Sequence, residues 1–235
     1  RVKTEVELRG IEAATEITGT AYERTFEATE AGDTEAEIAR RMVDAMRDEG
    51  GSAPWVLMTS APEDSGRIAR SPGSRTVEEG DMVWMDAGCA VEGYFSDFSR
   101  AGVVGGPSEV QRRTQDAVHD ATIAGIDAVE PGVSASEVAQ QCDDALQDVI
   151  DDTDSPVRNV PSRDAARVGH SLGLQVTELP SLAAPDSTTL EAGMVLTMEP
   201  AIATEDGTFH VEENLVVTED GARRLTPDRW ELWSC

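Results

Sequence analysis

Four carboxylates in this chain stand at spacings that could gather them around one site. Asp86 ends one apolar, strand-like run, and Glu199 ends another. Asp97 follows Asp86 after eleven residues and Glu212 follows Glu199 after thirteen, which suits adjacent strands folded back on each other. A carboxylate at the end of a buried strand is costly unless it is paired or coordinates a metal ion. These four side chains are therefore candidate metal ligands.

A metal centre would also relieve the repulsion that four converging carboxylates create. Adjacent carboxylates cannot all stay ionised without a compensating charge, which divalent cations supply. Oxygen-rich sites suit Mg or Mn, and a histidine ligand moves the preference toward Mn, Co, Fe or Zn. His170, in the segment GHSLGL, is the candidate histidine. Any one of these residues alone could be a surface acid or a structural histidine, and it is the set that favours metal binding.

Two internal repeats indicate which elements position the candidate ligands. The segment EAGDTEAEIA, residues 30–39, resembles EPGVSASEVA, residues 130–139. Each contains a capping box, in which a hydroxyl caps the start of a helix and a glutamate three residues later reaches back to the cap. These boxes pair Thr34 with Glu37 and Ser134 with Glu137.

The second repeat contains two of the candidate ligands. VEEGDMVWMD, residues 77–86, resembles LEAGMVLTME, residues 190–199, and the match superposes Asp86 on Glu199. Because both repeats occur in the same order, a duplicated unit is the better explanation. A site between the two halves would then take matching ligands from each.

Each half is predicted to run helix, helix, then strands. The predicted helices are 4–29, 34–49, 108–129 and 136–150. The predicted strands are 54–59, 82–89, 92–95, 98–104, 174–178, 194–202 and 209–217. This order indicates an α+β fold in which helices cover one face of a curved antiparallel sheet. We expect one domain over residues 1–235, with pseudo-twofold halves of about 1–105 and 106–235.

The charge of the chain excludes some partners. Asp and Glu total 46 against 19 Lys and Arg, so the net charge is -27 and repels nucleic acids and anionic membranes. No apolar run is long enough for a membrane span, and no signal peptide is recognisable. Three widely spaced cysteines favour reduced thiols in the cytoplasm, with Cys89 in the core. The acidic coat favours a salt-adapted source, since molar salt shortens the screening length to about 3 Å.

The order of the motifs resembles a known family. Asp86 and Asp97 with ten residues between them, GHxxG, MEP and VEE occur in the order seen in the pita-bread-fold metallopeptidases. That family includes Xaa-Pro aminopeptidase, Xaa-Pro dipeptidase and methionine aminopeptidase. The resemblance runs from about residue 4 to 225 and is closest to the Xaa-Pro branch. In that branch a separate N-terminal domain usually comes first, so we expect such a domain in the parent protein, because this chain begins at Arg1.

The resemblance implies a role for each ligand. Asp97 and Glu212 would bridge two metal ions, Asp86 would bind one ion, and His170 and Glu199 would bind the other. A hydroxide between the ions would attack the Xaa-Pro carbonyl, and Glu199 would carry a proton to the leaving amine. The expected cofactors are two divalent ions, Mn first, with Co, Zn or Fe as alternatives. We also expect a homodimer.

The substrate-facing positions depart from the family. Thr177 and Ala69 stand where the peptidases usually place histidines, and Ala166 stands where prolidase-like proteins often have another. His210 replaces an arginine two residues before Glu212. We expect His210 to replace a lost imidazole, as a catalytic residue in addition to Glu199, and Xaa-Pro dipeptides to be turned over slowly or not at all. The alternative is that His210 only supports Glu212. Arg70 is the other nearby substitute, because its guanidinium can bind a substrate carboxylate.

The sequence therefore predicts a metal-dependent hydrolase that acts on a small peptide, with the Xaa-Pro bond as the expected target. Two alternatives stay open. The departures at the substrate-facing positions would also suit a metal-dependent enzyme with a non-peptide small-molecule substrate. A catalytically inactive binding module is disfavoured, because such modules usually lose metal ligands and all five are present here.

Overall fold

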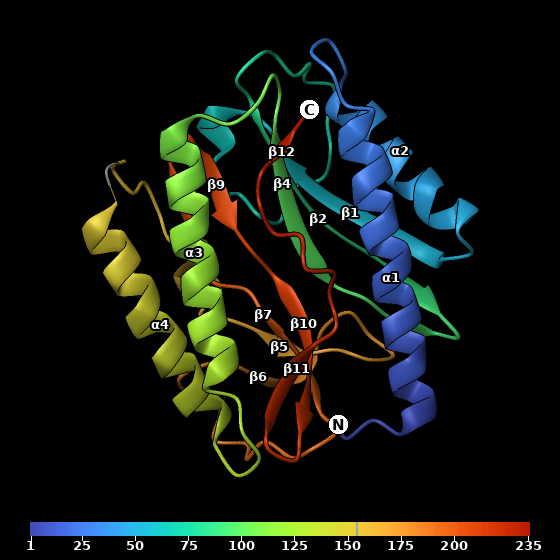
Figure 1. Cartoon of the computed structure of the whole chain (residues 1–235), viewed down its shortest axis with the longest axis vertical. Coiled ribbons are helices and arrows are strands. Elements are labelled where there is room, and N and C mark those ends of the chain that lie inside the picture. The colour runs from blue at the N-terminus through green and yellow to red at the C-terminus, as the bar shows by residue number, and fades with distance from the viewer. Residues whose placement is uncertain (154) are drawn as a thin grey trace.

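The computed structural model describes residues 1–153 and 155–235. Within these ranges the chain forms two helix pairs that lie on opposite sides of the molecule, with the strands between them (Figure 1). One pair is α1 (Glu5–Glu27) and α2 (Glu35–Asp48), and the other is α3 (Glu109–Asp127) and α4 (Ala135–Asp152). Short turns of helix, η1 (Pro62–Asp64) and α5 (Pro161–Asp164), lie in the connections. The predicted helices are confirmed, with ends that differ by at most two residues.

Capping boxes fix where the four long helices begin. The hydroxyl of each cap accepts from the third helical amide, and the side chain at that third position accepts from the amide of the cap. The caps are Thr4, Thr34, Ser108 and Ser134. Thr4, paired with Glu7, and Ser108, paired with Gln111, were not among the predicted caps.

In the described residues the strands form two five-stranded sheets and a separate hairpin. The first sheet contains β1 (Ser52–Thr59), β2 (Met82–Val91), β3 (Tyr94–Phe95), β4 (Phe98–Val103) and β12 (Trp233–Ser234). The second contains β5 (His170–Ser171), β6 (Glu178–Ser181), β7 (Val195–Met198), β10 (Glu213–Thr218) and β11 (Gly221–Arg224). The hairpin is β8 (Ala201–Thr204) with β9 (Gly207–His210). Neighbouring strands are antiparallel except β4 and β12, which are parallel.

The long predicted strands of the second half are wrong in one respect: each is interrupted. The predicted strand 194–202 divides into β7 and β8 at Glu199 and Pro200, and 209–217 divides into β9 and β10 at 211–212. Pro200 has no amide hydrogen for a ladder. Glu213 pairs with Met198 on one side of the break, and His210 pairs with Ala201 on the other. Both breaks therefore lie at the same level, and a candidate ligand stands in each.

The predicted strand 174–178 is also wrong, because β6 begins only at Glu178 and residues 174–177 form bends. The short strands β5, β11 and β12 were not predicted. At two residues, β5 and β12 are too short for an alternating pattern to be visible in the sequence.

The core joins each helix pair to the strands beside it. The hydroxyl of Tyr22 on α1 donates to the main-chain oxygens of Met85 and Phe98, at 3.0 and 2.8 Å, so α1 is tied to both β2 and β4. Cys89 is fully buried in this cluster, as expected. In the second half, Val138 and Cys142 of α4 pack with Leu196 and other side chains of β7 and β10.

The internal repeat has a counterpart in the hydrogen bonding. The cap residue Thr34 forms a β-bridge with Thr76, and Ser134 forms one with Thr189 at the matching place. Just before each cap, the amides of Gly32 and Gly132 donate to main-chain oxygens at 2.9 Å. The two halves are therefore built in the same way where each second helix begins.

The segment before α1 crosses to the second half. The Lys3 amide donates to the main-chain oxygen of Gly193 at 2.7 Å, and Val2 bridges Met194. The Lys3 side chain is 5% exposed and its Nζ lies 3.0 Å from Glu178 Oε2. No helix in the described part of the chain combines the length and apolar character that a bilayer span needs.

Candidate metal centre

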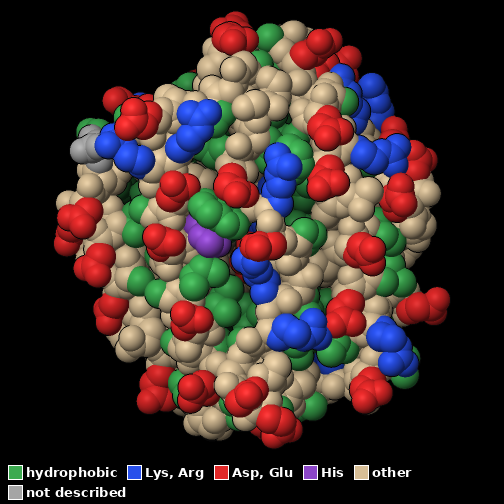
Figure 2. All heavy atoms as spheres, viewed as in Figure 1, with side chains coloured by type: hydrophobic (Ala, Val, Ile, Leu, Met, Phe, Trp, Pro, Cys, Tyr) green, Lys and Arg blue, Asp and Glu red, His purple; other side chains and the backbone are tan. Residues whose placement is uncertain are grey.

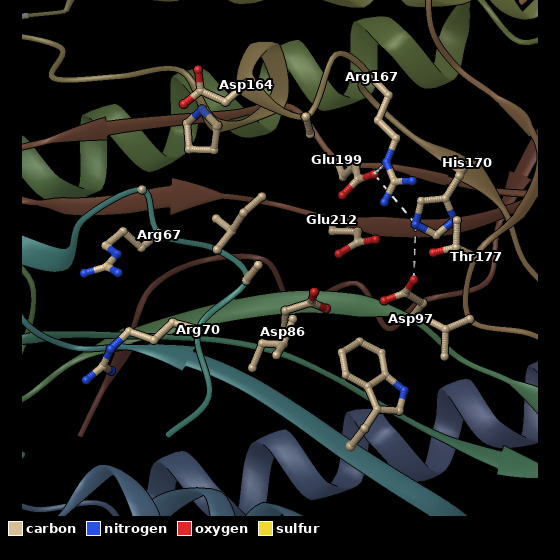
Figure 3. Close-up of a pocket in the computed structure, with 18 residues that line it drawn as sticks. Arg67, Arg70, Asp86, Asp97, Asp164, Arg167, His170, Thr177, Glu199 and Glu212 are labelled. Carbon is tan, nitrogen blue, oxygen red and sulfur yellow. Dashed lines mark ion pairs between the residues drawn. The ribbon is translucent and has the colours of Figure 1, made fainter. Parts of the chain in front are cut away.

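The five predicted ligands converge on one cavity. Asp86 lies on β2, and Asp97 lies between β3 and β4. His170 begins β5, while Glu199 and Glu212 stand in the paired breaks described above. All five line a cavity of about 800 Å³, and Figure 3 shows their side chains pointing toward one another. The structure thus brings together residues from both halves, as the repeat predicted.

The ligand atoms lie close enough to share metal ions. His170 Nε2 is 3.4 Å from Asp97 Oδ2 and 3.7 Å from Glu199 Oε1. Among residues 1–153 and 155–235, donor atoms within 4.8 Å of one another form two groups, one with Asp97, His170 and Glu212, the other with Glu199, His210 and Glu212. Glu212 belongs to both groups, so its carboxylate lies within reach of donor atoms on the His170 side and on the Glu199 side of the cluster.

Burial makes the charged forms of these carboxylates unfavourable. It raises the pKa of Asp86 to about 7 and that of Glu199 to about 7. It raises the pKa of Asp97 and Glu212 well above the usual values, and the neighbouring carboxylates raise them further. Among the described residues, both oxygens of Glu212 and one each of Asp86 and Glu199 lack a hydrogen-bond partner. Buried oxygens of this kind are what a divalent cation would satisfy.

His170 presents one nitrogen to the cavity. Its Nδ1 lies 3.0 Å from the main-chain oxygen of Ser171, which can only accept a hydrogen bond, so Nδ1 carries the proton. Burial lowers the pKa of His170 to about 4, which keeps the ring neutral. Nε2 then directs its lone pair into the cavity near Asp97 and Glu199, where a metal ion would accept it. A metal-binding histidine is usually oriented in this way by a bond to its other nitrogen.

Glycine lets the His170 segment approach β7. A Cβ atom on Gly169 would collide with the main-chain oxygen of Thr197, so a larger residue would push the segment away. The His170 amide donates to the Thr197 hydroxyl at 3.2 Å. These contacts hold the ring beside the end of β7, where Glu199 emerges.

Residues that sequence reasoning did not single out fix the other ligands. Asn214 accepts from the Asp97 amide at 3.1 Å and donates to the Asp97 main-chain oxygen. Arg100 on β4 donates to the main-chain oxygen of Glu212 at 2.8 Å and pairs with the buried Glu213 at 3.0 Å. Arg100 stands three residues after the candidate ligand Asp97, which was the one available signal, whereas no pattern distinguished Asn214.

His210 lies close to the ligands but does not line the cavity. Its Nε2 is 4.0 Å from Glu199 Oε2, and its ring stacks on Trp84 with the centroids 5.3 Å apart. The ring is 1% exposed, and burial lowers the pKa of His210 to about 3. Neither ring nitrogen has a hydrogen-bond partner among the described residues. The structure therefore places a neutral imidazole against Glu199, inside the protein.

The positions expected to face the substrate line two different cavities. Ala69, Arg70 and Thr177 line the cavity, and Ala166 lines a smaller neighbouring one. The guanidinium of Arg70 already has two partners: Nη1 is 2.6 Å from Glu35 Oε2, and Nε is 3.2 Å from Asp64 Oδ2. The expected role of Arg70 toward a substrate carboxylate would require these ion pairs to loosen.

Arg167 is a further cavity residue that sequence reasoning missed. It stands three residues before His170, and its Nε lies 3.2 Å from Glu199 Oε1 (Figure 3). Its position next to Ala166 was the available signal, because a charged residue adjoins the place of a lost histidine. The positive charge of Arg167 limits the rise in pKa of all four ligand carboxylates.

Solved structures share the architecture. X-Pro aminopeptidase from Thermotoga maritima superposes with a TM-score of 0.89 at 26% identity, covering 100% of this chain and 64% of that one. Prolidase from Pyrococcus furiosus superposes with a TM-score of 0.85 at 30% identity, covering 97% of this chain and 66% of that one. The expected α+β pita-bread fold is confirmed.

Sequence comparison agrees. The Xaa-Pro dipeptidase of Pyrococcus furiosus is 31% identical over 233 residues, which cover 98% of this chain and 64% of the relative. The chain thus spans about two thirds of the length of this curated relative. The model described as Metallopeptidase family M24 matches residues 9–219, and this chain belongs to that family.

Proposed function

We propose that the chain is the catalytic part of a dinuclear metal-dependent hydrolase that cleaves Xaa-Pro dipeptides. The observation that carries this proposal is the convergence of the five candidate ligands on one cavity, where both oxygens of Glu212 are buried and lack hydrogen bonds from described residues. A carboxylate in that position is suited to bridge two cations. The similarity to Xaa-Pro dipeptidases supports the choice of substrate.

The five residues suit two ions with unequal ligand sets. Asp97 and Glu212 would bridge, Asp86 would complete one site, and His170 with Glu199 would complete the other. The short His170–Glu199 distance, 3.7 Å between Nε2 and Oε1, supports their sharing an ion. Oxygen ligands with one imidazole favour Mn, with Co, Zn or Fe as alternatives.

The side chains of the chain itself account for binding and proton transfer. Two divalent cations, when bound, acidify water and polarise a carbonyl oxygen. Glu199 can accept a proton and pass it to the leaving nitrogen, because its carboxylate faces the cavity beside His170. Asn214 and Arg100 hold the backbone of Asp97 and Glu212 in place. A cavity of about 800 Å³ is in the range of sites for small ligands.

A second candidate function is hydrolysis of a non-peptide small molecule by the same centre. The observation that favours it is the presence of Ala69 and Thr177 in the cavity wall, where neither side chain offers an imidazole. A substrate that needs fewer hydrogen-bond donors would tolerate this wall.

We further propose a cytoplasmic, salt-adapted homodimer. Free cysteines support a reducing compartment, and the acidic side chains spread over the face in Figure 2 support adaptation to salt. The exposed apolar side chains Val2, Val6, Leu174 and Leu179 are candidates for a contact between two copies. Sedimentation at several protein concentrations would test the dimer.

The proposed activity is tested by metal content and turnover measured together. Elemental analysis of the purified chain after incubation with Mn²⁺ should give two ions per chain, and the loaded protein should hydrolyse a panel of Xaa-Pro dipeptides. Two bound ions with no turnover of any Xaa-Pro dipeptide would favour the non-peptide substrate. Absence of bound metal would overturn both candidate functions.

A further inference from the structure

The only lysine of the chain lies next to the wall of the main cavity. Lys and Arg total 19 residues, and Lys3 is the one lysine among them. Its side chain is 5% exposed, and its Nζ donates to Glu178 Oε2 at 3.0 Å. Glu178 directly follows the turn of residues 172–177 that joins β5 to β6, hereafter the wall turn. Val176 and Thr177 of the wall turn line the cavity, so Lys3 contacts the immediate neighbour of a side chain that would face the substrate.

Glu178 uses its second carboxylate oxygen to hold the wall turn. Its Oε1 accepts from the Gln175 amide at 3.2 Å, and the Gly173 amide donates to the Gln175 main-chain oxygen at 3.0 Å. Glu178 also pairs with Ser171 of β5 across the hairpin. The carboxylate thus connects the lysine with the backbone of the wall turn.

The wall turn is tied to two other segments of the chain. From the first half, the Phe95 amide donates to the Gly173 main-chain oxygen at 2.8 Å. The second tie is Lys3, whose own amide donates to the Gly193 main-chain oxygen at 2.7 Å, two residues before β7. Because the Lys3–Glu178 pair is largely shielded from solvent, salt screens it less than it screens surface ion pairs. This tie therefore persists at the ionic strength expected for a salt-adapted protein.

The space around the Lys3 ammonium is confined. A Cβ atom on Gly173 would lie 2.9 Å from Lys3 Cε and Nζ and 2.8 Å from Glu178 Oε1, so a larger residue would displace the ion pair. An ammonium is a compact charge, whereas the guanidinium of arginine is a planar fork that needs more space. This confinement favours lysine at the one position where the chain does not use arginine for a basic side chain.

We propose that Lys3 is a positioning residue for the substrate: through Glu178 it holds the wall turn, so that Val176 and Thr177 form a fixed side of the cavity. This inference rests on the proposed hydrolysis at the dinuclear centre. Neither Lys3 nor Glu178 lines the cavity, so neither touches a substrate there. Loss of the Lys3 charge therefore weakens substrate binding while the five candidate ligands keep their places.

The test measures steady-state kinetics with Ala-Pro, and metal content, for the Mn²⁺-loaded wild type and for Lys3→Met, Lys3→Arg and Gly173→Ala. Lys3→Met removes the charge, and KM should rise by about 10- to 100-fold, as when a small displacement misplaces a binding group. The value of kcat and the metal content should stay within about twofold of the wild type, because only binding is affected. Lys3→Arg keeps the charge without the compact shape, so its KM should be intermediate. Gly173→Ala changes no charged group, yet KM should rise because the added Cβ displaces the ion pair.

The matched control is Arg223→Met. Arg223 on β11 pairs with Glu12 on α1 at 2.7 Å, so this ion pair also joins the N-terminal part of the chain to the second half. The two side chains are 51% and 36% exposed, and neither lines the cavity. Arg223→Met should therefore leave KM for Ala-Pro unchanged.

Two kinetic results would overturn the inference. An unchanged KM in Lys3→Met is one. A loss of activity that follows loss of metal is the other, because Lys3 would then act through the ligand His170 rather than through the wall turn.

Hydrogen exchange, read by mass spectrometry, separates this inference from the proposed function. If no Xaa-Pro dipeptide is hydrolysed, faster exchange of the wall turn in Lys3→Met and Gly173→Ala, but not in Arg223→Met, would support the positioning role while the proposed function fails. Exchange of the wall turn that is the same in Lys3→Met as in the wild type would overturn the inference whether or not the protein hydrolyses these dipeptides.

Discussion

Asn214 on β10 binds both main-chain polar groups of Asp97, the amide and the carbonyl. Its side-chain oxygen accepts from the Asp97 amide, and its side-chain nitrogen donates to the Asp97 carbonyl. Asp97 comes from the first half of the chain and Asn214 from the second. The side chain of Asn214 is fully buried, so water cannot replace these bonds. The position of one candidate bridging ligand thus depends on a residue that binds no metal itself.

We expect Asn214→Ala to lower the free energy of unfolding by about 1–3 kcal/mol, because two buried backbone groups lose their partners. Metal affinity should fall by about 10- to 100-fold, as is common when a residue that orients a ligand is removed. Denaturant unfolding and metal titration measure the two effects. Asn159→Ala removes the other asparagine of the chain and should leave metal affinity unchanged. Unchanged affinity in Asn214→Ala would contradict the positioning role.

Asp97→Ala should leave less than one metal ion per chain, because a bridging ligand serves both ions. His170→Ala should affect one ion more than the other, since His170 belongs to one of the two candidate positions. Elemental analysis after dialysis measures both variants. Asp164→Ala is the matched control, because Asp164 lines the same cavity outside the ligand groups. Two ions retained in Asp97→Ala would be incompatible with the assignment.

The metal-free protein should lose stability as the pH rises from about 4.5 to 7. Burial raises the pKa of Asp86 and Glu199 to about 7, so the folded state binds more protons than the unfolded state in this range. The free energy of unfolding then falls with pH, by about 1.4 kcal/mol per pH unit for each group that titrates. With Mn²⁺ bound the trend should weaken or reverse, since metal ions favour the ionised carboxylates. Thermal melts at several pH values, with and without Mn²⁺, measure the difference. If stability changed with pH in the same way with and without Mn²⁺, Asp86 and Glu199 would not be the groups that cause the change.

His210→Phe should lower kcat at least about tenfold while preserving most of the stability. Phenylalanine can keep the stacking on Trp84 but has no ring nitrogen to face Glu199. His210→Ala should lower both kcat and stability, because it also leaves a cavity. Steady-state kinetics and melting temperatures, with metal content measured alongside, distinguish the two effects. A wild-type kcat in His210→Phe would show that His210 contributes only to packing.

The melting temperature should rise between dilute buffer and molar KCl. The net charge of -27 produces repulsion among surface carboxylates, and molar salt shortens the screening length to about 3 Å. Equimolar sorbitol, which does not screen charge, is the control. A melting temperature that is unchanged or lower in KCl would rule out screening as the source of stability.

The parts of the fold that were predictable are those encoded locally. The capping boxes at Thr34 and Ser134 fixed helix starts within one residue, because all their partners lie within one turn. The carboxylates Asp86 and Glu199 were recognisable because each ends an apolar run. The breaks beside Glu199 and Glu212 were not predictable, since both flanking segments have strand-like sequences and only the pairing of distant strands separates them.

The side chains that complete the site were harder to predict for a similar reason. Asn214 stands in an ordinary strand, and its contact with Asp97 spans 117 residues. Arg167 reaches Glu199 because the chain turns after α5. The local sequence does not show in which direction the long Arg167 side chain points. The local sequence indicates which residues could bind metal, whereas the residues that hold these ligands in place are brought near them by tertiary contacts.

The contact of the N-terminal segment with the second half, made through Lys3, can also be monitored by chemical labelling of amines. Lysine occurs once in the sequence, and its ammonium is almost fully buried against Glu178. An acylating reagent can therefore reach a side-chain amine only when the N-terminal segment detaches from the second half. The rate of labelling at Lys3, read by mass spectrometry, would report how often this detachment occurs in the native protein.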